Sequence, residues 1–224
     1  MKLKNLYLHR FEFFLITQAF ILFGSLFVPY DFHENILLPI LFLLNTCAGI
    51  LLISKKKKLM WFLILLILAS LVVFGSSMIT RTTEGNLLAR MSIYFVFYII
   101  VTWNIVQQVW GAQYVNKNVI MGLMSGYIAL GFLAFFLFLS IELVAPGSFE
   151  GVLMSQHDFD LRADSIMYYA YITLLTIGYG EIIPVTSIAQ KAAILVGLLG
   201  QFYMVIITAV VVEKYIRHST KDKT

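Results

Sequence analysis

Apolar residues occupy long, nearly continuous blocks of this chain, and short polar segments separate the blocks. A helix needs about 20 apolar residues to cross the hydrocarbon core of a bilayer. Blocks of about this length predict six transmembrane helices, at Phe13–Tyr30, Ile36–Ile53, Leu59–Ile79, Leu87–Trp110, Val119–Ile141 and Ala192–Val212. The pattern therefore predicts an all-α integral membrane protein.

The composition and the charges support this prediction and orient the chain. Hydrophobic residues make up 60% of the chain and charged residues only 12%, against about 25% charged residues in an average soluble domain. With the N-terminus inside, all Lys and Arg residues except Arg81, Arg90, Arg162 and Lys191 fall on the cytoplasmic side, as the positive-inside rule requires. We expect a multi-pass protein of the plasma (inner) membrane with both termini cytoplasmic.

A run of four lysines lies between the second and third apolar blocks: Lys55, Lys56, Lys57 and Lys58. Its first expected role is to fix the orientation of the chain in the membrane, and binding of anionic lipid headgroups is a second. The formal net charge of +4 is accounted for by this sidedness, so no nucleic-acid partner is expected. The single cysteine, Cys47, lies in an apolar block, which excludes an intrachain disulfide and a cysteine metal cluster.

One short polar sequence interrupts the last third of the chain: Thr176, Ile177, Gly178, Tyr179 and Gly180. A narrow potassium pore must replace the water shell of the ion with backbone carbonyl oxygens. Glycine allows the backbone conformations that bring such carbonyls onto one axis, because it has no Cβ. This run resembles the selectivity filter of the potassium-channel pore family. The resemblance implies K+ sites at Thr176, Ile177, Gly178 and Tyr179.

The flanks of the run resemble the same family. Met167 to Leu175 is similar to the short re-entrant pore helix, and Thr173 to the first threonine of the filter pattern. The resemblance implies that Tyr168 and Tyr169 brace the filter and that Glu181, where the family usually has Asp, joins a hydrogen-bond network at the outer mouth. Leu175 departs from the family, since many members have Thr or Ser there. The resemblance covers about Val119 to Tyr215, less than half of the chain.

The resemblance implies two domains. Residues 1–118 form a four-helix membrane domain at the position of a voltage sensor. Residues 119–224 form a pore domain with an outer helix, a turret, a pore helix, the filter, an inner helix and a short tail. Because one chain carries only one filter, four copies must assemble into a homotetrameric pore. Arg90 is the only basic residue between Leu87 and Trp110, whereas a voltage sensor needs three or four gating charges, so strong voltage gating is not expected.

The inner helix and the turret supply further candidates. Gly200 matches the gating-hinge position of the family, whereas Gly197 is the better candidate for close packing against the pore helix. Gln201 is expected to face either the cavity or a neighbouring span. The turret, from about Glu142 to Asp164, carries five carboxylates that are expected to raise the local cation concentration.

The sequence thus predicts a non-enzymatic, potassium-selective channel that conducts K+ passively, without a cofactor. Two alternatives remain open. A weakly selective cation channel would need a disrupted filter, and a non-conducting scaffold or sensor would be derived from a channel. The degenerate first four helices and Leu175 are the sequence features in favour of the second alternative.

Overall fold

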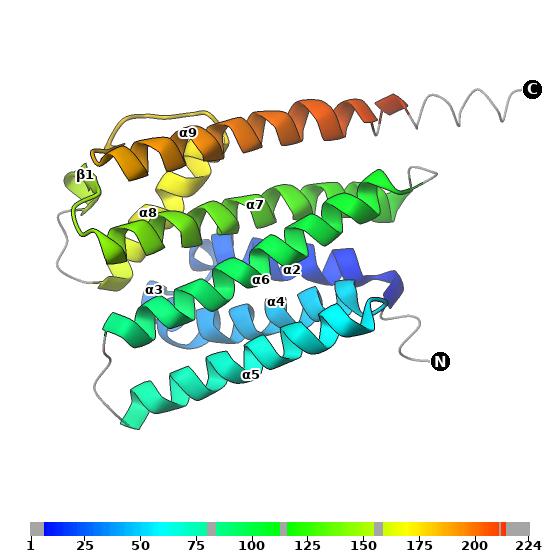
Figure 1. Ribbon diagram of the computed structural model, residues 1–224, viewed down its shortest axis with the longest axis horizontal. Coiled ribbons are helices and arrows are strands. Elements are labelled where there is room, and N and C mark those ends of the chain that lie inside the picture. Colours follow the sequence, from blue (N-terminus) through cyan, green and yellow to red (C-terminus); the bar gives the residue numbers. More distant parts are fainter. Residues whose placement is uncertain (1–6, 80–83, 113–115, 155–158, 211, 214–224) are drawn as a thin grey trace, which may run out of the picture. The chain divides into compact units, whose positions relative to one another are not determined.

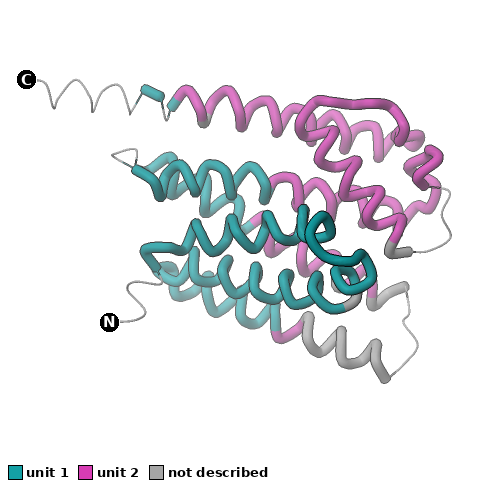
Figure 2. The backbone as a smooth tube through the Cα atoms, turned by 180° about the vertical axis from the view of Figure 1, so that it is seen from behind, with its two compact units in different colours: residues 1–67, 100–129, 210–224 teal, residues 68–99, 130–209 magenta. Residues whose placement is uncertain are grey.

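The computed structural model describes residues 7–79, 84–112, 116–154, 159–210 and 212–213. Within these residues the chain forms two compact units (Figure 2). Unit 1 comprises residues 1–67, 100–129 and 210–224, and unit 2 comprises residues 68–99 and 130–209. Three long helices, α5 (Lys57–Ile79), α6 (Glu84–Trp110) and α7 (Lys117–Val144), have one part in each unit.

Unit 1 begins with α2 (Arg10–Phe23), which packs against α4 (Leu38–Ile53). Short helical turns connect the two helices: η1 (Gly24–Leu26), α3 (Tyr30–Phe32) and the π-helical η2 (His33–Leu37). The first part of α5, the last part of α6 and the first part of α7 complete the unit. The apolar block predicted at 13–30 is therefore broken after Phe23 in the structure.

The α2 helix is apolar on its exposed face as well as on its buried face. Phe13, Ile16 and Phe20 are 45%, 51% and 50% exposed, while Phe14 is fully buried. Polar side chains, in contrast, lie inside: Gln18 is fully buried, and its amide meets the backbone carbonyl of Ser125 and the N–H of Ala129. A helix with an apolar outer face and polar inner contacts is suited to lipid, not to water.

Unit 2 contains the short elements around the filter. These are β1 (Phe149–Gly151), the 3-10 turn η3 (Val152–Met154), α8 (Phe159–Leu174), β2 (Ile182–Pro184), α9 (Ser187–Phe202) and the π-helical η4 (Tyr203–Ile207). The strands β1 and β2 pair antiparallel, with Gly151 opposite Ile182. The all-helical prediction misses this pair, because three-residue strands leave no alternating pattern long enough to recognise.

Aromatic side chains fill the core of unit 2. Tyr98 of α6 stacks on Phe132 of α7 at 5.2 Å between ring centroids, and Phe132 meets Tyr171 of α8 edge-on at 5.9 Å. A Cβ on Gly131 would lie 2.1 Å from the Tyr171 ring. Only glycine at that position lets the pore-helix ring reach α7, so these contacts fix α8 against the outer helix.

Glu142 has a structural role that corrects its assignment to the charged turret. Its carboxylate accepts hydrogen bonds from the backbone N–H groups of Gly147, Ser148 and Phe149 at 2.9, 3.0 and 3.2 Å. The residue is only 8% exposed. This carboxylate therefore stabilises the turn after α7 and is not a solvent-exposed charge that attracts ions.

Three helices within the described residues are long and apolar enough to cross a membrane: Leu87–Trp110, Lys117–Val144 and Ser187–Val210. The α2 and α4 helices are shorter, with 14 and 16 residues. The chain is thus a helical membrane protein by the length and composition of these segments. Six spans and the domain division after residue 118 stay predictions.

Candidate functional site

The filter sequence follows directly on the C-terminal end of α8. This helix runs from Phe159 to Leu174 and so begins eight residues before the predicted start at Met167. Residues 175–181 then form a loop without regular structure, which ends at β2. The loop returns along the first half of α9 to the start of that helix (Figure 1).

Hydrogen bonds to α8 set the direction of the peptide groups in this loop. The N–H of Thr176 donates to the Thr173 carbonyl at 3.1 Å, and the N–H groups of Ile177 and Gly178 donate to the Ile172 carbonyl at 2.8 and 3.3 Å. In a trans peptide the N–H and the preceding carbonyl point in opposite directions, and no described peptide bond is cis. The carbonyls of residues 175, 176 and 177 therefore point away from α8.

The backbone of the loop alternates between left-handed and other conformations. Thr176, Gly178 and Gly180 have φ angles of 57°, 58° and 91°, whereas Ile177 and Tyr179 are not in the left-handed region. Such alternation turns successive N–H groups to one side of the chain, and their carbonyls consequently to the other. Thr176 takes this conformation although it is β-branched, which marks a strained position.

The loop is uncovered in the single chain. All six residues from Leu175 to Gly180 are exposed, and the side chains of Ile177 and Tyr179 are 47% and 74% exposed. Apolar side chains of this size on a held loop fit an interface with other chains. The predicted K+ ligands therefore lie in one exposed segment, which is held to α8 on one side.

The β1–β2 pair holds the outer end of the loop. A Cβ on Gly151 would lie 2.0 Å from the Glu181 carbonyl oxygen, and the φ angle of Gly151 is +150°. Beyond the strands, the N–H of Val185 donates to the Ser148 carbonyl at 2.9 Å. Thr186 caps the start of α9, because its side-chain oxygen accepts a hydrogen bond from the N–H of Ala189. Backbone contacts thus fix the loop at both ends.

Tyr168 and Glu181, both predicted to support the filter, lie near each other. The pKa of the Tyr168 phenol is raised to about 12. The interaction with the Glu181 carboxylate is the larger cause, and desolvation is the smaller one. Both carboxylate oxygens are nevertheless buried and have no partner of full hydrogen-bond geometry among the described residues. Tyr168 and Glu181 therefore lie within reach of each other without a hydrogen bond of full geometry. A buried, unpartnered carboxylate is costly, which makes this contact a weak point of the single chain.

Tyr169 packs into an aromatic cluster between α8, α7 and β1. It is 5% exposed, and its ring lies 5.1 Å from Phe138 and 5.3 Å from Phe149 between centroids. Thr173, one helical turn further along α8, contributes its backbone carbonyl to the N–H of Thr176. Tyr169 thus belongs to an aromatic cluster against α8, and Thr173 supplies a carbonyl at the end of this helix, while their role in bracing the filter stays a prediction.

Of the two glycines Gly197 and Gly200, the second and not the first packs closely against α8. A Cβ on Gly200 would lie 2.2 Å from the Leu174 carbonyl oxygen, whereas no described residue lies within 4 Å of a Cβ on Gly197. The expectation that Gly197 packs against the pore helix is wrong, because the last turn of α8 meets the helix one turn further on. The hinge role of Gly200 stays a prediction. The π-helical turn η4 begins three residues later, and such turns are sites of helix bending.

Gln201, the neighbour of Gly200, reaches the filter. Its Nε2 donates to the Thr176 hydroxyl oxygen at 3.2 Å, and the same hydroxyl donates to the Leu175 carbonyl at 2.7 Å. Gln201 therefore faces the inner end of the filter. Its sequence signal was limited to a polar residue on an apolar helix.

Two of the four predicted lipid-binding lysines make contacts inside unit 1. Lys55 lies over the Tyr7 ring at 4.7 Å, and Lys56 donates to the side-chain oxygens of Asn104 and Gln107, both at 2.7 Å. Within the described residues, Lys57 and Lys58 are exposed, and their side chains have no such partner.

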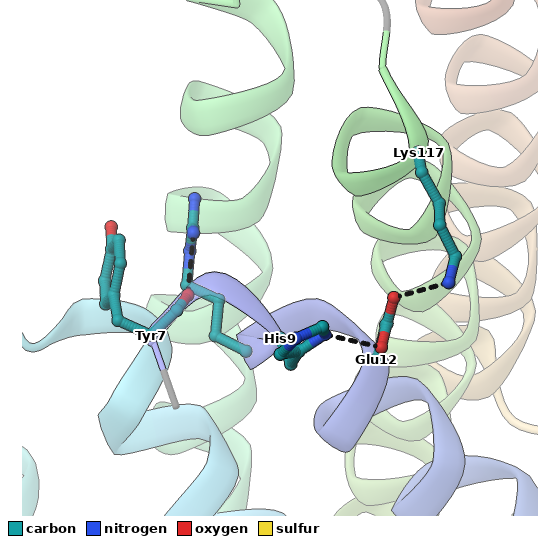
Figure 3. A network of polar contacts seen from close by, with 5 residues as sticks. Tyr7, His9, Glu12 and Lys117 are labelled. Atoms are coloured by element: carbon teal, nitrogen blue, oxygen red, sulfur yellow. Dashed lines mark hydrogen bonds and ion pairs between the residues drawn. The ribbon is translucent and has the colours of Figure 1, made fainter. Parts of the chain in front are cut away.

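An ion pair near the start of α2 joins it to the start of α7. The Lys117 ammonium lies 2.8 Å from one oxygen of Glu12, and His9 lies 2.9 Å from the other (Figure 3). These interactions, with Lys117 first, lower the pKa of Glu12 below its ordinary value of 4.5. The pair therefore remains ionised at neutral pH.

Residues 128–217 match a family model described as an ion channel. The matched segment includes most of α7, all of α8, the filter loop and α9. No curated protein and no solved structure matches the chain. These residues are therefore similar to an ion channel domain, and passive ion conduction is the function that this similarity suggests.

Proposed function

We propose that four copies of this chain form a potassium-selective channel, which conducts K+ passively across the plasma membrane. The observation that carries this proposal is the direction of the filter carbonyls. The N–H groups of Thr176, Ile177 and Gly178 are engaged by α8. The carbonyls of residues 175, 176 and 177 thereby point away from α8, and carbonyls that point to the open side can serve a dehydrated cation as oxygen ligands.

The homotetramer supplies what one chain lacks. A single loop offers one carbonyl at each level, whereas a ring of four surrounds an ion. The exposed side chains of Ile177 and Tyr179 would be covered by neighbouring copies in such a ring. Further exposed apolar residues on α9, among them Ile194 at 64% and Val205 at 64%, would face neighbouring copies or lipid.

The intact Gly-Tyr-Gly sequence favours potassium over the two alternatives. A weakly selective channel would need a loop whose carbonyls are not held in line, and here three consecutive N–H groups are held. A non-conducting scaffold would not need the alternating backbone of Thr176, Gly178 and Gly180, which costs free energy at Thr176. No enzymatic step and no cofactor enters the proposal, since the carbonyls act only as ligands.

The sidedness of the lysines completes the proposal. Both termini lie in the cytoplasm, and Lys57 and Lys58 contact anionic headgroups at the membrane surface. Lys55 and Lys56 take a smaller part, because their ammonium groups are already engaged by Tyr7, Asn104 and Gln107.

Ion flux through liposomes tests the function directly. Purified protein is reconstituted into vesicles, and flux is measured with K+ and then with Na+ as the permeant ion. We expect K+ flux and little Na+ flux. Equal flux of both ions would favour the weakly selective channel, and no flux of either ion would favour the scaffold.

Tyr179→Asp provides the matched variant for this test. The substitution replaces a 74% exposed aromatic side chain and leaves every backbone hydrogen bond of the loop available. We expect the variant to assemble and to lose discrimination between K+ and Na+. Unchanged selectivity would mean that Tyr179 does not help to hold the ring of carbonyls.

A further inference from the structure

The inner end of the filter has a hydrogen-bond chain that involves three residues. The Gln201 amide donates to the Thr176 hydroxyl at 3.2 Å, and this hydroxyl donates to the Leu175 carbonyl at 2.7 Å. A hydroxyl has one proton and two lone pairs. Since the proton is engaged by Leu175, the hydroxyl can only accept from Gln201, which places the amide nitrogen and not the amide oxygen against it.

This chain leaves the Thr176 oxygen in a defined state. One lone pair accepts from Gln201, and the other is left for a cation that arrives from the cavity. Consecutive hydrogen bonds polarise one another, so donation to the Leu175 carbonyl also increases the electron density on the Thr176 oxygen. The hydroxyl is therefore held in one orientation and is ready to act as a ligand.

The apolar side chain of Leu175 explains why the hydrogen bond to Thr176 comes from α9. An apolar side chain at that position cannot hydrogen-bond to the filter from the pore-helix side. The Gln201 side chain reaches the neighbouring residue, Thr176, from α9. The contact is set by Gly200, since its missing Cβ lets α9 approach the Leu174 carbonyl closely.

We propose that Gln201 is a positioning residue for the innermost cation site of the filter. It holds the Thr176 hydroxyl in the orientation that binds a cation, and it thereby sets the affinity of that site for ions from the cytoplasmic side. This inference rests on the proposed channel function. In a tetramer the contact occurs four times around one ion.

The test uses Ba²⁺ and the variant Gln201→Met. Ba²⁺ is close to K+ in size but has twice its charge, so it occupies potassium-sized oxygen sites and leaves them slowly. Methionine keeps the length and the unbranched shape of glutamine but cannot donate. Single-channel recordings in bilayers, with Ba²⁺ added on the cytoplasmic side, give the block affinity and the exit rate.

We expect Gln201→Met to weaken block by cytoplasmic Ba²⁺ by roughly tenfold, because four hydroxyls lose their pre-set orientation. The rate at which extracellular Ba²⁺ enters should not change, because that ion meets the outer part of the filter first. A merely structural role of Gln201 would alter both. Gln190→Leu is the control: it removes a glutamine from the same helix, where the partners are the carbonyls of Pro184 and Val185, and should leave cytoplasmic block unchanged.

Each result decides the matter. Equal or tighter cytoplasmic block in Gln201→Met, in a channel that conducts, would overturn the positioning role and leave the channel function intact. A Met variant that no longer assembles would show that the contact maintains the fold, and this would overturn the proposal equally. Unmodified protein without K+ current would refute the channel function itself.

Discussion

Gly200→Ala should destabilise the pore domain, and the structure indicates by how much. The new Cβ would lie 2.2 Å from the Leu174 carbonyl oxygen, whereas ordinary contact begins at 3.4 Å. The two helices must therefore separate by about 1.2 Å, the difference between these distances. The carbonyl is a backbone group of the last turn of α8, so relief of this contact requires the backbone of α8 or α9 to move.

The expected cost follows from overpacking, which is typically about 1–3 kcal/mol per site. Alanine regains about 1 kcal/mol of helix propensity relative to glycine, so the packing penalty matches or exceeds this gain in each subunit. In the proposed tetramer the effect is multiplied by four. The displaced Leu174 also adjoins the residues whose N–H groups α8 holds, so conduction should fall as well.

Gly197→Ala is the matched control, three residues earlier on the same helix. No atom of the described part of the chain lies within 4 Å of its added Cβ, so only the propensity gain remains, and stability should be equal or higher. The assay is thermal dissociation of the purified assembly in detergent, with K+ current measured in parallel. If Gly200→Ala were as stable as the unmodified protein, or if Gly197→Ala lost equal stability, this account of the packing would be refuted.

Three further predictions concern other parts of the chain. Glu142→Gln should lower the free energy of unfolding by about 1–3 kcal/mol per subunit, because one amide oxygen cannot satisfy three backbone donors; thermal unfolding checks this, and an unchanged midpoint would contradict it. Glu12 has a lowered pKa, so its pairing with Lys117 stabilises the fold above pH 4.5 and is lost as pH falls through the folded-state pKa. Glu12→Gln should therefore be less stable at pH 7 and equal to the unmodified protein in strong acid, whereas a difference that persists in acid would argue against the ion pair. Open probability should vary only weakly with voltage, since Arg90 is the only basic residue between Leu87 and Trp110; an e-fold change within a few millivolts in recordings would require several gating charges.

The filter was predictable from sequence because its chemistry depends on residue type. Only glycine adopts positive φ at little cost, so the glycines of the motif marked the left-handed positions Gly178 and Gly180. The start of the pore helix was not predictable in the same way. Residues 159–164 include Asp160, Arg162 and Asp164 and suggested a solvated loop, although an acidic residue in the first turn favours a helix.

Contacts between distant residues were the part that sequence could not supply. Gly197 and Gly200 look alike in an apolar run, and only the path of α8 decides which of them meets Leu174. From sequence, Glu142 was expected to be a solvent-exposed charge. In the structure, three backbone N–H groups of the turn after α7 surround its carboxylate. Six transmembrane helices, the tetramer and selectivity for K+ stay predictions, since they depend on membrane and partner chains.

Because the filter loop is anchored at both ends, we expect it to tolerate insertions and deletions poorly. The α8 helix ends at Leu174 and β2 begins at Ile182, and backbone contacts hold both points. A side-chain replacement at Ile177 or Tyr179, which are outside the left-handed region, leaves the backbone path intact. An inserted or deleted residue would shift the alternation of φ by one position, so every carbonyl beyond it would turn to the wrong side. Evolution and protein engineering can therefore vary the side chains of Ile177 and Tyr179 more freely than the number of residues between the two ends.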